Sequence, residues 1–300
     1  MIKLTIGENE KEQRLDRFLL KLLNNATRSQ VFSWIRKKTV RVNGKSAQEN
    51  QRLMLGDTLE IRISEESFET LSKKTVIQQK AAAKLDIVYE DDEILVVNKP
   101  AGLLTHPDKD EYQNTLATQV QLYLQDSCSR TFRPASIQRL DKNTSGLVIF
   151  GKTYDSLKKY NELMRERKIH KFYLCIVEGN VTEAGEVEGY ICKDGDANTV
   201  SIRFEPDDYH QTYVHTRYRP LKQGKEHTLL EVELLTGRSH QIRASLGAIG
   251  HPIYGDAKYG AESRRKKFQV LHAWKVVLEN REFTCPSSEM DSIWKSLNQA

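Results

Sequence analysis

The chain lacks the features of membrane-spanning and secreted proteins. No uninterrupted apolar run among its 300 residues approaches the roughly 20 residues that span a bilayer. The N-terminal segment Met-Ile-Lys-Leu-Thr-Ile-Gly-Glu contains no apolar core of the signal-peptide type. These absences predict a cytoplasmic protein with no membrane partner.

Metal and disulfide patterns are also lacking. The 4 cysteines are scattered, without a Cys-x-x-Cys pair, and the 8 histidines form no His-Glu-x-x-His spacing. Zinc knuckles and disulfide scaffolds both need close or patterned ligands. The sequence therefore predicts no metal, and thiols that are reduced and partly buried.

The positive charge of the chain is concentrated near its N-terminus. Residues 1–63 hold 13 Lys and Arg against 7 Asp and Glu, whereas the formal net charge of the whole chain is only +5. A compact basic module attached to a near-neutral body predicts a polyanion-binding domain.

The basic module has a readable secondary-structure pattern. Apolar residues at helical spacing predict helices over about residues 15–23 and 29–38. Asn43-Gly44 follows residues 40–42 and predicts a hairpin, because both residues tolerate positive φ. Alternating apolar residues predict a strand over 59–63. Two helices followed by small strands form a compact αβ module.

Residues 12–63 resemble the S-four RNA-binding domain. The resemblance rests on Arg14-Leu-Asp-Arg-Phe-Leu, Ser29-Gln-Val, Val40-Arg-Val-Asn-Gly-Lys and Gly56-Asp57. In that fold, exposed cations around the second helix meet RNA phosphates. The alternative is that the cations only solvate a helix face. The resemblance implies RNA binding by Arg28, Arg36, Lys37, Lys38 and Lys45.

The rest of the chain divides into a linker and a larger body. Residues 64–84 are polar without core periodicity, which predicts a linker, with a short helix as one form of it. Residues 85–300 combine predominant strands with recurring hairpin turns, which predicts an α+β body with a mixed, mostly antiparallel sheet. Helices are expected over about 115–124 and 155–166 and from 239, and strands over 87–90, 94–99, 147–150, 172–177, 213–220, 228–235 and 271–278.

The most informative segment is Ile-Gln-Arg-Leu-Asp-Lys-Asn-Thr-Ser-Gly at residues 137–146. Asp141 lies between Arg139 and Lys142, shortly before an apolar run. A neighbouring cation favours the ionised form of a carboxylate. An ionised aspartate at the lip of a buried strand can act as a nucleophile or a base. From this segment alone, a surface ion pair beside a turn is the favoured interpretation.

Four other segments give Asp141 a context: Asn98–Pro107, His170–Tyr173, Leu234–Arg243 and His251–Gly260. Together with residues 137–146 they resemble the catalytic body of the RluA family of pseudouridine synthases, in the family's order, over about residues 86–278. The resemblance implies an RNA pseudouridine synthase, an isomerase that acts on RNA and needs no cofactor.

The resemblance also implies individual roles. Asp141 is the catalytic aspartate, Tyr173 lies against the target uracil, and Arg243 pairs with the catalytic carboxylate. Because a reacting base must leave its stack, Arg139 is implied to fill the vacancy. One departure is Gln138, where the family usually has His. We interpret it as a variation that alters rate or substrate fit without removing a reacting group.

Several alternatives stay open at this point. The two-part layout implies large-subunit ribosomal RNA as substrate, with transfer RNA as the alternative. A non-catalytic RNA-binding or ribosome-assembly protein on the same fold, and a hydrolase that releases free uracil, are further classes. A monomer is the default expectation. His106, His170 and His240 are interpreted as structural or hydrogen-bonding residues, and residues 264–267 as a solvated or RNA-contacting loop.

Overall fold

The computed structural model describes residues 1–72, 85–194, 199–206, 212–262 and 268–298. The chain divides into two compact units. The first consists of residues 1–83, 119–135 and 151–158, and the second of residues 84–118, 136–150 and 159–300. No helix within the described residues is both long and apolar enough to cross a bilayer.

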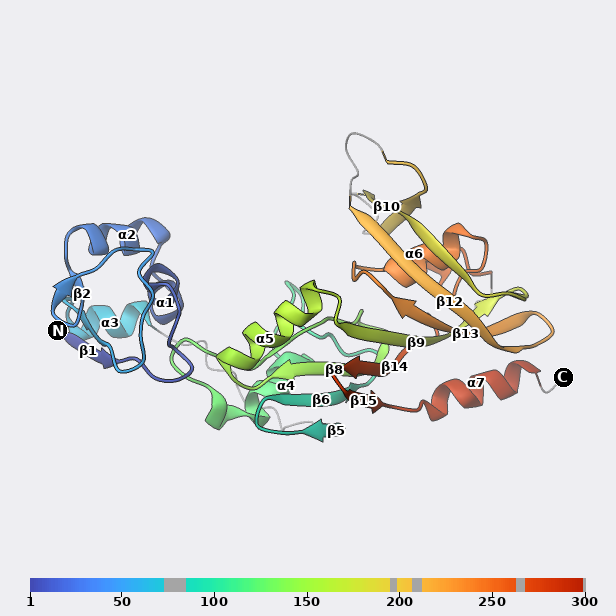
Figure 1. Ribbon diagram of the computed structural model, residues 1–300, viewed down its shortest axis with the longest axis horizontal. Helices are drawn as coiled ribbons and strands as arrows, with labels where there is room; N and C mark the ends of the chain where they lie inside the picture. Colours follow the sequence, from blue (N-terminus) through green and yellow to red (C-terminus); the bar gives the residue numbers. More distant parts are fainter. Residues whose placement is uncertain (73–84, 195–198, 207–211, 263–267, 299–300) are drawn as a thin grey trace. The chain divides into compact units, whose positions relative to one another are not determined.

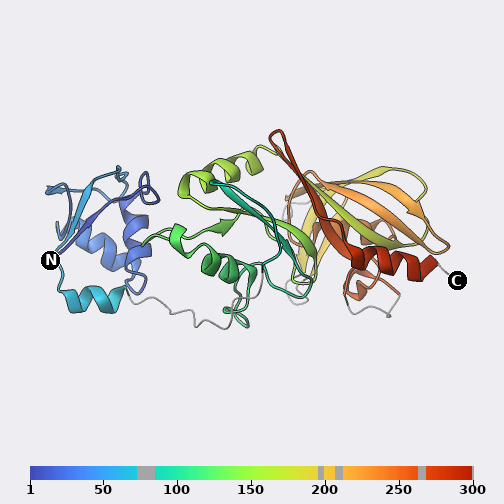
Figure 2. The same ribbon diagram turned by 90° about the horizontal axis from the view of Figure 1, so that it is seen from below.

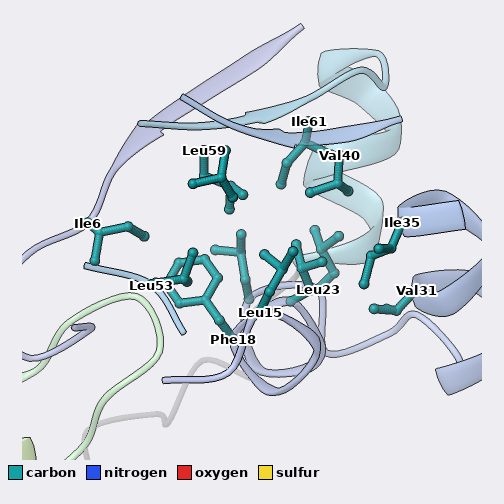
Figure 3. Packing of buried hydrophobic residues seen from close by; sticks show 13 residues of the cluster. Ile6, Leu15, Phe18, Leu23, Val31, Ile35, Val40, Leu53, Leu59 and Ile61 are labelled. Atoms are coloured by element: carbon teal, nitrogen blue, oxygen red, sulfur yellow. The ribbon is translucent and has the colours of Figure 1, made fainter. Parts of the chain in front are cut away.

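The core of the first unit lies between short helices and a small sheet (Figure 3). Helices α1 (Leu15–Leu22) and α2 (Arg28–Arg36) occur where periodicity predicted them. The sheet has the order β1-β4-β2-β3, formed by Ile2–Thr5, Thr58–Ile61, Val40–Val42 and Lys45–Ser46. The apolar side chains of both helices pack on this sheet. The buried residues from the helices and the strands are Leu15, Phe18, Leu19, Leu22, Leu23, Val31, Ile35, Val40, Val42, Leu59 and Ile61.

Local sequence signals fix the start of helix α2 and the hairpin that follows it. Thr27 and Gln30 form a capping box that satisfies backbone N–H groups at the start of α2. Asn43 and Gly44 adopt φ values of 51° and 72°, which confirms the predicted hairpin between β2 and β3. Helix α3 (Glu65–Leu71) is the short helix expected in the linker. The rest of that linker, residues 73–84, lies outside the described residues.

Two later segments belong to the first unit and were not expected there. The Arg130 guanidinium donates to the Glu10 carboxylate at 3.2 Å, although Glu10 is only 1% exposed. The Tyr154 N–H donates to Asn9 Oδ1 at 3.1 Å. These contacts explain why residues 119–135 and 151–158 cluster with the N-terminal module.

The second unit is organised by one sheet, whose order is β11-β10-β12-β13-β9-β14-β8-β6-β5, with β15 on β14 and β7 on β8 (Figure 1). Pairing is antiparallel from β11 to β14, whereas β14 and β8 run parallel. The predicted α+β class with a mostly antiparallel sheet is confirmed. The strands are Ile87–Glu90, Ile94–Lys99, Ala135–Ser136, Ser145–Gly151, Ile169–Glu178, Gly185–Asp194, Thr199–Arg203, Tyr213–Gln223, His227–Leu234, Leu271–Leu278 and Arg281–Thr284, in order β5 to β15.

Helices α4 (Leu116–Tyr123) and α5 (Tyr154–Arg165) each contribute residues to both units, whereas α6 (Gln241–Ala248) and α7 (Ser288–Asn298) belong to the second unit. Helix α6 lies against β10, β11 and β12 (Figure 1). Helix α7 packs Ile293, Trp294 and Leu297 on the β9–β13 region (Figure 2). The 3-10 turns Gln125–Ser127 and Ala257–Tyr259 complete the elements. Strands β1, β7, β10, β11 and β15 and helix α7 were not predicted.

One close approach fixes the middle of this sheet. Gly146 on β8 pairs with Ala273 on β14, and Ala273 pairs with Tyr173 on β9. Gly146 has φ 111°, and a Cβ atom there would lie 2.2 Å from the Ala273 carbonyl oxygen. Only glycine fits, because any side chain would separate the two strands.

We predict that Gly146→Ala lowers the free energy of unfolding by about 2–4 kcal/mol, since backbone strain and overpacking add. Gly250→Ala is the matched control, because Gly250 has φ 81° with open space around its missing Cβ. It should cost only the backbone strain, about 1 kcal/mol. Urea unfolding of both variants measures the difference. Equal losses of unfolding free energy in the two variants would show that the close approach to Ala273 does not add to the cost of Gly146→Ala.

Candidate active site

Asp141 lies in a loop, residues 140–144, that leads into β8. A second loop, which follows β6, holds this segment by its backbone. The Thr105 hydroxyl donates to the Leu140 carbonyl at 2.8 Å and accepts from the Leu140 N–H at 3.2 Å. The Gly102 N–H donates to the Lys142 carbonyl at 2.9 Å. The residues on either side of Asp141 are therefore fixed by backbone bonds.

Lys99 strengthens the same attachment from a fully buried position. Its Nζ donates to the carbonyls of Pro100 at 2.9 Å, Leu103 at 2.7 Å and Lys142 at 3.0 Å. Three carbonyl oxygens satisfy the three N–H groups of the ammonium. Burial lowers the pKa of Lys99 to about 8, while the nearby Asp141 carboxylate acts in the opposite direction. Sequence reasoning singled out this segment but gave Lys99 no part in it.

Arg243 connects Asp141 to a second, buried carboxylate. Its Nη1 lies 3.3 Å from Asp141 Oδ2, so the implied pair is brought together. Its shorter contacts are with Asp256, from Nε to Oδ2 at 2.6 Å and from Nη2 to Oδ1 at 2.8 Å. Asp256 is 2% exposed, whereas the Asp141 side chain is 27% exposed. Asp256 therefore fixes the guanidinium plane, and the remaining nitrogen faces Asp141.

The electrostatics of Arg243 follow from this arrangement. Burial by itself disfavours the charged guanidinium and is the largest single effect, but the hydrogen bonds to Asp256 and the charges of Asp256 and Asp141 together outweigh it and raise the pKa of Arg243. The guanidinium carbon also lies 4.8 Å from the centre of the Tyr259 ring. A cation above an aromatic face is stabilised further. Arg243 is thus a permanently charged and oriented donor beside Asp141.

Two turns bring these residues together. Helix α6 begins directly after His240, whose φ is 57°, and the Gln241 side chain closes the turn by accepting from the Thr236 hydroxyl at 2.9 Å and the Arg238 N–H at 3.1 Å. Asp256 follows a segment that pairs with the end of β9, where the Tyr254 N–H donates to the Ile176 carbonyl at 2.8 Å.

His240 lies at the edge of this cluster. Its Nε2 is 3.8 Å from Asp141 Oδ2, and its Nδ1 shares a hydrogen bond with the Tyr259 hydroxyl at 2.8 Å. Burial lowers the pKa of His240, Asp141 opposes this, and Arg243 adds to the lowering. The lowered pKa favours the neutral imidazole, and its hydrogen bond orients the Tyr259 hydroxyl. The interpretation of His240 as a hydrogen-bonding residue is confirmed.

Tyr173 presents a neutral phenol. It lies on β9 and is only 5% exposed. Burial raises the pKa of Tyr173, and the Asp141 charge raises it further. Among the described residues its hydroxyl has no hydrogen-bond partner. The ring is therefore available as an apolar surface with one free O–H group.

Asp141 and Tyr173 both line a cavity of about 960 Å³. Asp141 is the single carboxylate among its described lining residues, and the positively charged or basic ones are Arg139, Arg165, Arg167, His170, Lys171 and Arg238. Arg139 is exposed and has no partner in the described part of the chain. A large cavity with many cations, one carboxylate and one phenol suits a polyanion that carries a planar ring.

Gln138 also lines this cavity. Its Nε2 donates to the Leu147 carbonyl at 3.4 Å, while its Oε1 is buried without a partner within the described residues. The residue that departs from the family pattern therefore supports the start of β8 and keeps an unused acceptor.

The five cations predicted to bind RNA lie in the first unit. Each is exposed, and none has an ion-pair partner in the portion of the chain that the structure describes. Other cations of this unit are paired, such as Lys3 with Glu60 at 3.5 Å and Arg14 with Asp16 at 2.9 Å. The unpaired set is Arg28, Arg36, Lys37, Lys38 and Lys45. Residues 264–267, the other predicted basic segment, are outside the described residues.

One group of possible metal ligands occurs in the described ranges, at Glu186, Glu188 and His215. His215 lies 2.6 Å from Glu186, and Arg217 donates to the same carboxylate at 2.7 Å. These neighbours already balance the Glu186 charge. The group is not part of the cavity that Asp141 lines.

Comparison with known proteins identifies both parts of the chain. Residues 93–248 match the family described as RNA pseudouridylate synthase, and residues 13–59 match the S4 domain. The chain is 31% identical to ribosomal large subunit pseudouridine synthase D of Nitrosomonas europaea, covering 98% of this chain and 84% of that protein. It is 33% identical to the Yersinia pestis protein of the same name, covering 88% and 78%.

Solved structures show the same fold. Human RNA pseudouridylate synthase domain containing 4 aligns with a TM-score of 0.59 at 22% identity, covering 71% of this chain and 92% of that one. Human RNA pseudouridylate synthase domain containing 1 aligns with a TM-score of 0.58 at 24% identity, covering 74% and 89%.

We predict that Lys99→Met lowers the free energy of unfolding by roughly 2–5 kcal/mol, because buried carbonyls lose their donor. The folded protein releases the Lys99 proton near pH 8, whereas the unfolded chain keeps it up to 10.5. The stability that Lys99 contributes therefore rises with pH between these values, by at most about 1.4 kcal/mol per pH unit.

Urea unfolding at about pH 7 and about pH 9.5 checks this: the gap between the native protein and Lys99→Met should widen at the higher pH. Lys142→Met is the control, since Lys142 is exposed in the neighbouring loop. A gap that narrows with pH would contradict the assignment.

Proposed function

The chain belongs to the RNA pseudouridylate synthase family, and we propose that it isomerises selected uridines of large-subunit ribosomal RNA to pseudouridine. The observation that carries this proposal is the Asp141–Arg243–Asp256 arrangement at the wall of a cation-rich cavity that also presents Tyr173. The named function of the bacterial relatives supports the choice of ribosomal RNA.

The reaction requires few chemical groups. The N1–C1′ bond of uridine breaks, the C5–C1′ bond forms, and the proton lost from C5 is balanced by one gained at N1. Product and substrate are isomers, so no redox partner is consumed. In our proposal, Asp141 supplies the carboxylate that reacts with the nucleoside and divides one difficult step into two. No cofactor takes part.

Each neighbour of Asp141 has a distinct proposed role. Arg243, held by Asp256, orients the Asp141 carboxylate and balances its negative charge before the reaction. Tyr173 packs against the uracil while the ring turns, and its O–H group forms hydrogen bonds with the base. A neutral phenol suits this role, because an apolar ring contacts a planar base without repelling it.

The target base must leave its stack before it reaches Asp141, which costs a few kcal/mol. We propose that Arg139 offsets part of this cost by occupying the vacancy with its planar guanidinium. Its exposure, its place on the cavity wall and its lack of a partner among the described residues support this role.

The proposed division of labour follows the charge distribution. Residues 1–63 act as an RNA-binding domain, residues 64–84 as a linker and residues 85–300 as the catalytic domain. The separate apolar core of the N-terminal module supports this division. Its five unpaired cations bind phosphates and contribute affinity, whereas the choice of uridine belongs to the second unit.

We also propose that the enzyme acts as a monomer in the cytoplasm, without metal. The residues assigned to the reaction all come from the second unit of a single chain, which supports the monomer. A carboxylate, a guanidinium and a phenol provide the nucleophile, the counter-charge and the contact surface that the isomerisation requires, so no Lewis acid is needed.

We predict that the purified native protein forms pseudouridine in ribosomal RNA without added metal or nucleotide, and that Asp141→Asn binds the same RNA but forms none. Nucleoside mass spectrometry with chemical derivatisation measures the product in large-subunit ribosomal and transfer RNA transcripts.

Four outcomes separate the alternatives. Pseudouridine in transfer RNA alone would make transfer RNA the substrate in place of ribosomal RNA. Release of free uracil would indicate a hydrolase. Turnover by Asp141→Asn would refute the role of Asp141. Native protein that binds ribosomal RNA but modifies neither RNA would favour an assembly protein.

We predict that the double variant Lys37→Ala/Lys38→Ala binds RNA more weakly and with a smaller salt dependence. The slope of log affinity against log salt should fall by about 1.5, since each lost phosphate contact removes roughly 0.7–0.9. The rate at saturating RNA should stay unchanged. Lys3→Ala is the control, because Lys3 is already paired with Glu60. An unchanged slope of log affinity against log salt would indicate that Lys37 and Lys38 lie on a solvated helix face and do not contact RNA.

A further inference from the structure

Lys171 is a buried cation that the proposed chemistry does not use. It lies on β9 between Ile169 and Tyr173, and these alternate residues are all buried. Alternate residues of a strand point to the same face of the sheet. All three line the large cavity. Lys171 therefore reaches the cavity beside Tyr173, about 7 Å further along the strand.

The ammonium group of Lys171 has no partner in the part of the chain that the structure describes. Although the residue is only 8% exposed, it forms no hydrogen bond or ion pair with the described residues. Burial lowers the pKa of Lys171, and no carboxylate acts in the opposite direction. Lys99 is also buried, but three carbonyls satisfy it. The Lys171 Nζ is not one of the fully enclosed polar atoms, so the ammonium opens on the cavity and is available to an anion from outside the protein.

The surroundings of Lys171 leave space for such an anion. Its Nζ is close to Gly237, where a Cβ atom would lie only 3.3 Å away. Glycine keeps this approach to the ammonium free of a side chain. The lining residues nearby in sequence, His170 and Arg238, are basic, and the one lining carboxylate, Asp141, precedes another strand. The local chemistry selects an anion.

We propose that Lys171 binds an RNA phosphate that flanks the uridine held against Tyr173. This inference rests on the proposed function, because it takes the uracil to lie on Tyr173. A compact ammonium binds a phosphate as a point charge. The separation of two strand residues is comparable to the span from a base to its own phosphate. Lys171 is thus a positioning residue that fixes the backbone of the extruded nucleotide.

The test is a chemical double-variant cycle in the Asp141→Asn background, where RNA is bound without turnover. The probe is a short ribosomal RNA fragment that contains the modified uridine, with either natural phosphates or one neutral methylphosphonate linkage on the 5′ or the 3′ side. We expect Lys171→Met to weaken binding of the natural fragment about tenfold. In the protein that keeps Lys171, one methylphosphonate should weaken RNA binding by the same factor. In Lys171→Met, the same linkage should hardly change RNA binding.

Two further variants exclude a purely structural role. Lys171→Arg keeps the charge and should stay sensitive to the methylphosphonate. Lys168→Met is the matched control, because Lys168 is an exposed neighbour paired with Glu166 at 2.7 Å, and its effect should not depend on the linkage. Thermal unfolding of Lys171→Met should occur at the native temperature or above, because an unpaired buried charge is removed.

The outcomes distinguish this inference from the function beneath it. A native protein that forms no pseudouridine in any RNA refutes the proposed function. A native protein that forms it, with methylphosphonate effects at both linkages that are the same with and without Lys171, refutes the phosphate contact alone. A marked loss of stability in Lys171→Met would show that the ammonium is a structural group.

Discussion

The site depends on the buried ion pair between Arg243 and Asp256. Two hydrogen bonds, at 2.6 and 2.8 Å, satisfy one edge of the guanidinium and fix its plane, so that Nη1 is the nitrogen directed to Asp141 at 3.3 Å. A buried arginine without its carboxylate would be strongly destabilising. The pair therefore constrains both segments that carry it: the turn before α6, and the segment that attaches residues 252–254 to the end of β9.

The second constraint acts on the backbone around Asp141. Lys99, Gly102 and Thr105 hold the residues on either side of it, while the contact between Gly146 and Ala273 sets where β8 starts relative to Tyr173. The carboxylate, the guanidinium and the phenol come from different parts of the chain, yet each is held by bonds that are complete before any ligand arrives. In the proposed reaction, such preorganisation lets the groups act on the uracil ring without rearrangement.

Sequence reasoning found the elements whose signals are local. Asn43-Gly44 specified its hairpin, and the apolar runs of β8 and β14 were evident. Strand β10 and helix α7 were missed, because Gly185–Asp194 mixes glutamate and glycine with its apolar residues and α7 packs on distant strands. The same limit applies to the site. Asp256 lies within a segment that was singled out, but its bond to Arg243 depends on tertiary structure that no spacing reveals.

The cations of the chain fall into two groups according to their partners. Those with protein partners support the fold, and those without are proposed to bind RNA. A structural cation such as Lys99 has an acceptor for each N–H group, so its hydrogen bonds are satisfied inside the fold. Among the described residues, Arg139, Lys171 and the N-terminal set have no hydrogen-bond or ion-pair partner, so they are available to an anion from outside the protein. In the proposed function, the N-terminal cations supply salt-sensitive affinity for the RNA backbone, and the cations of the second unit position the nucleotide.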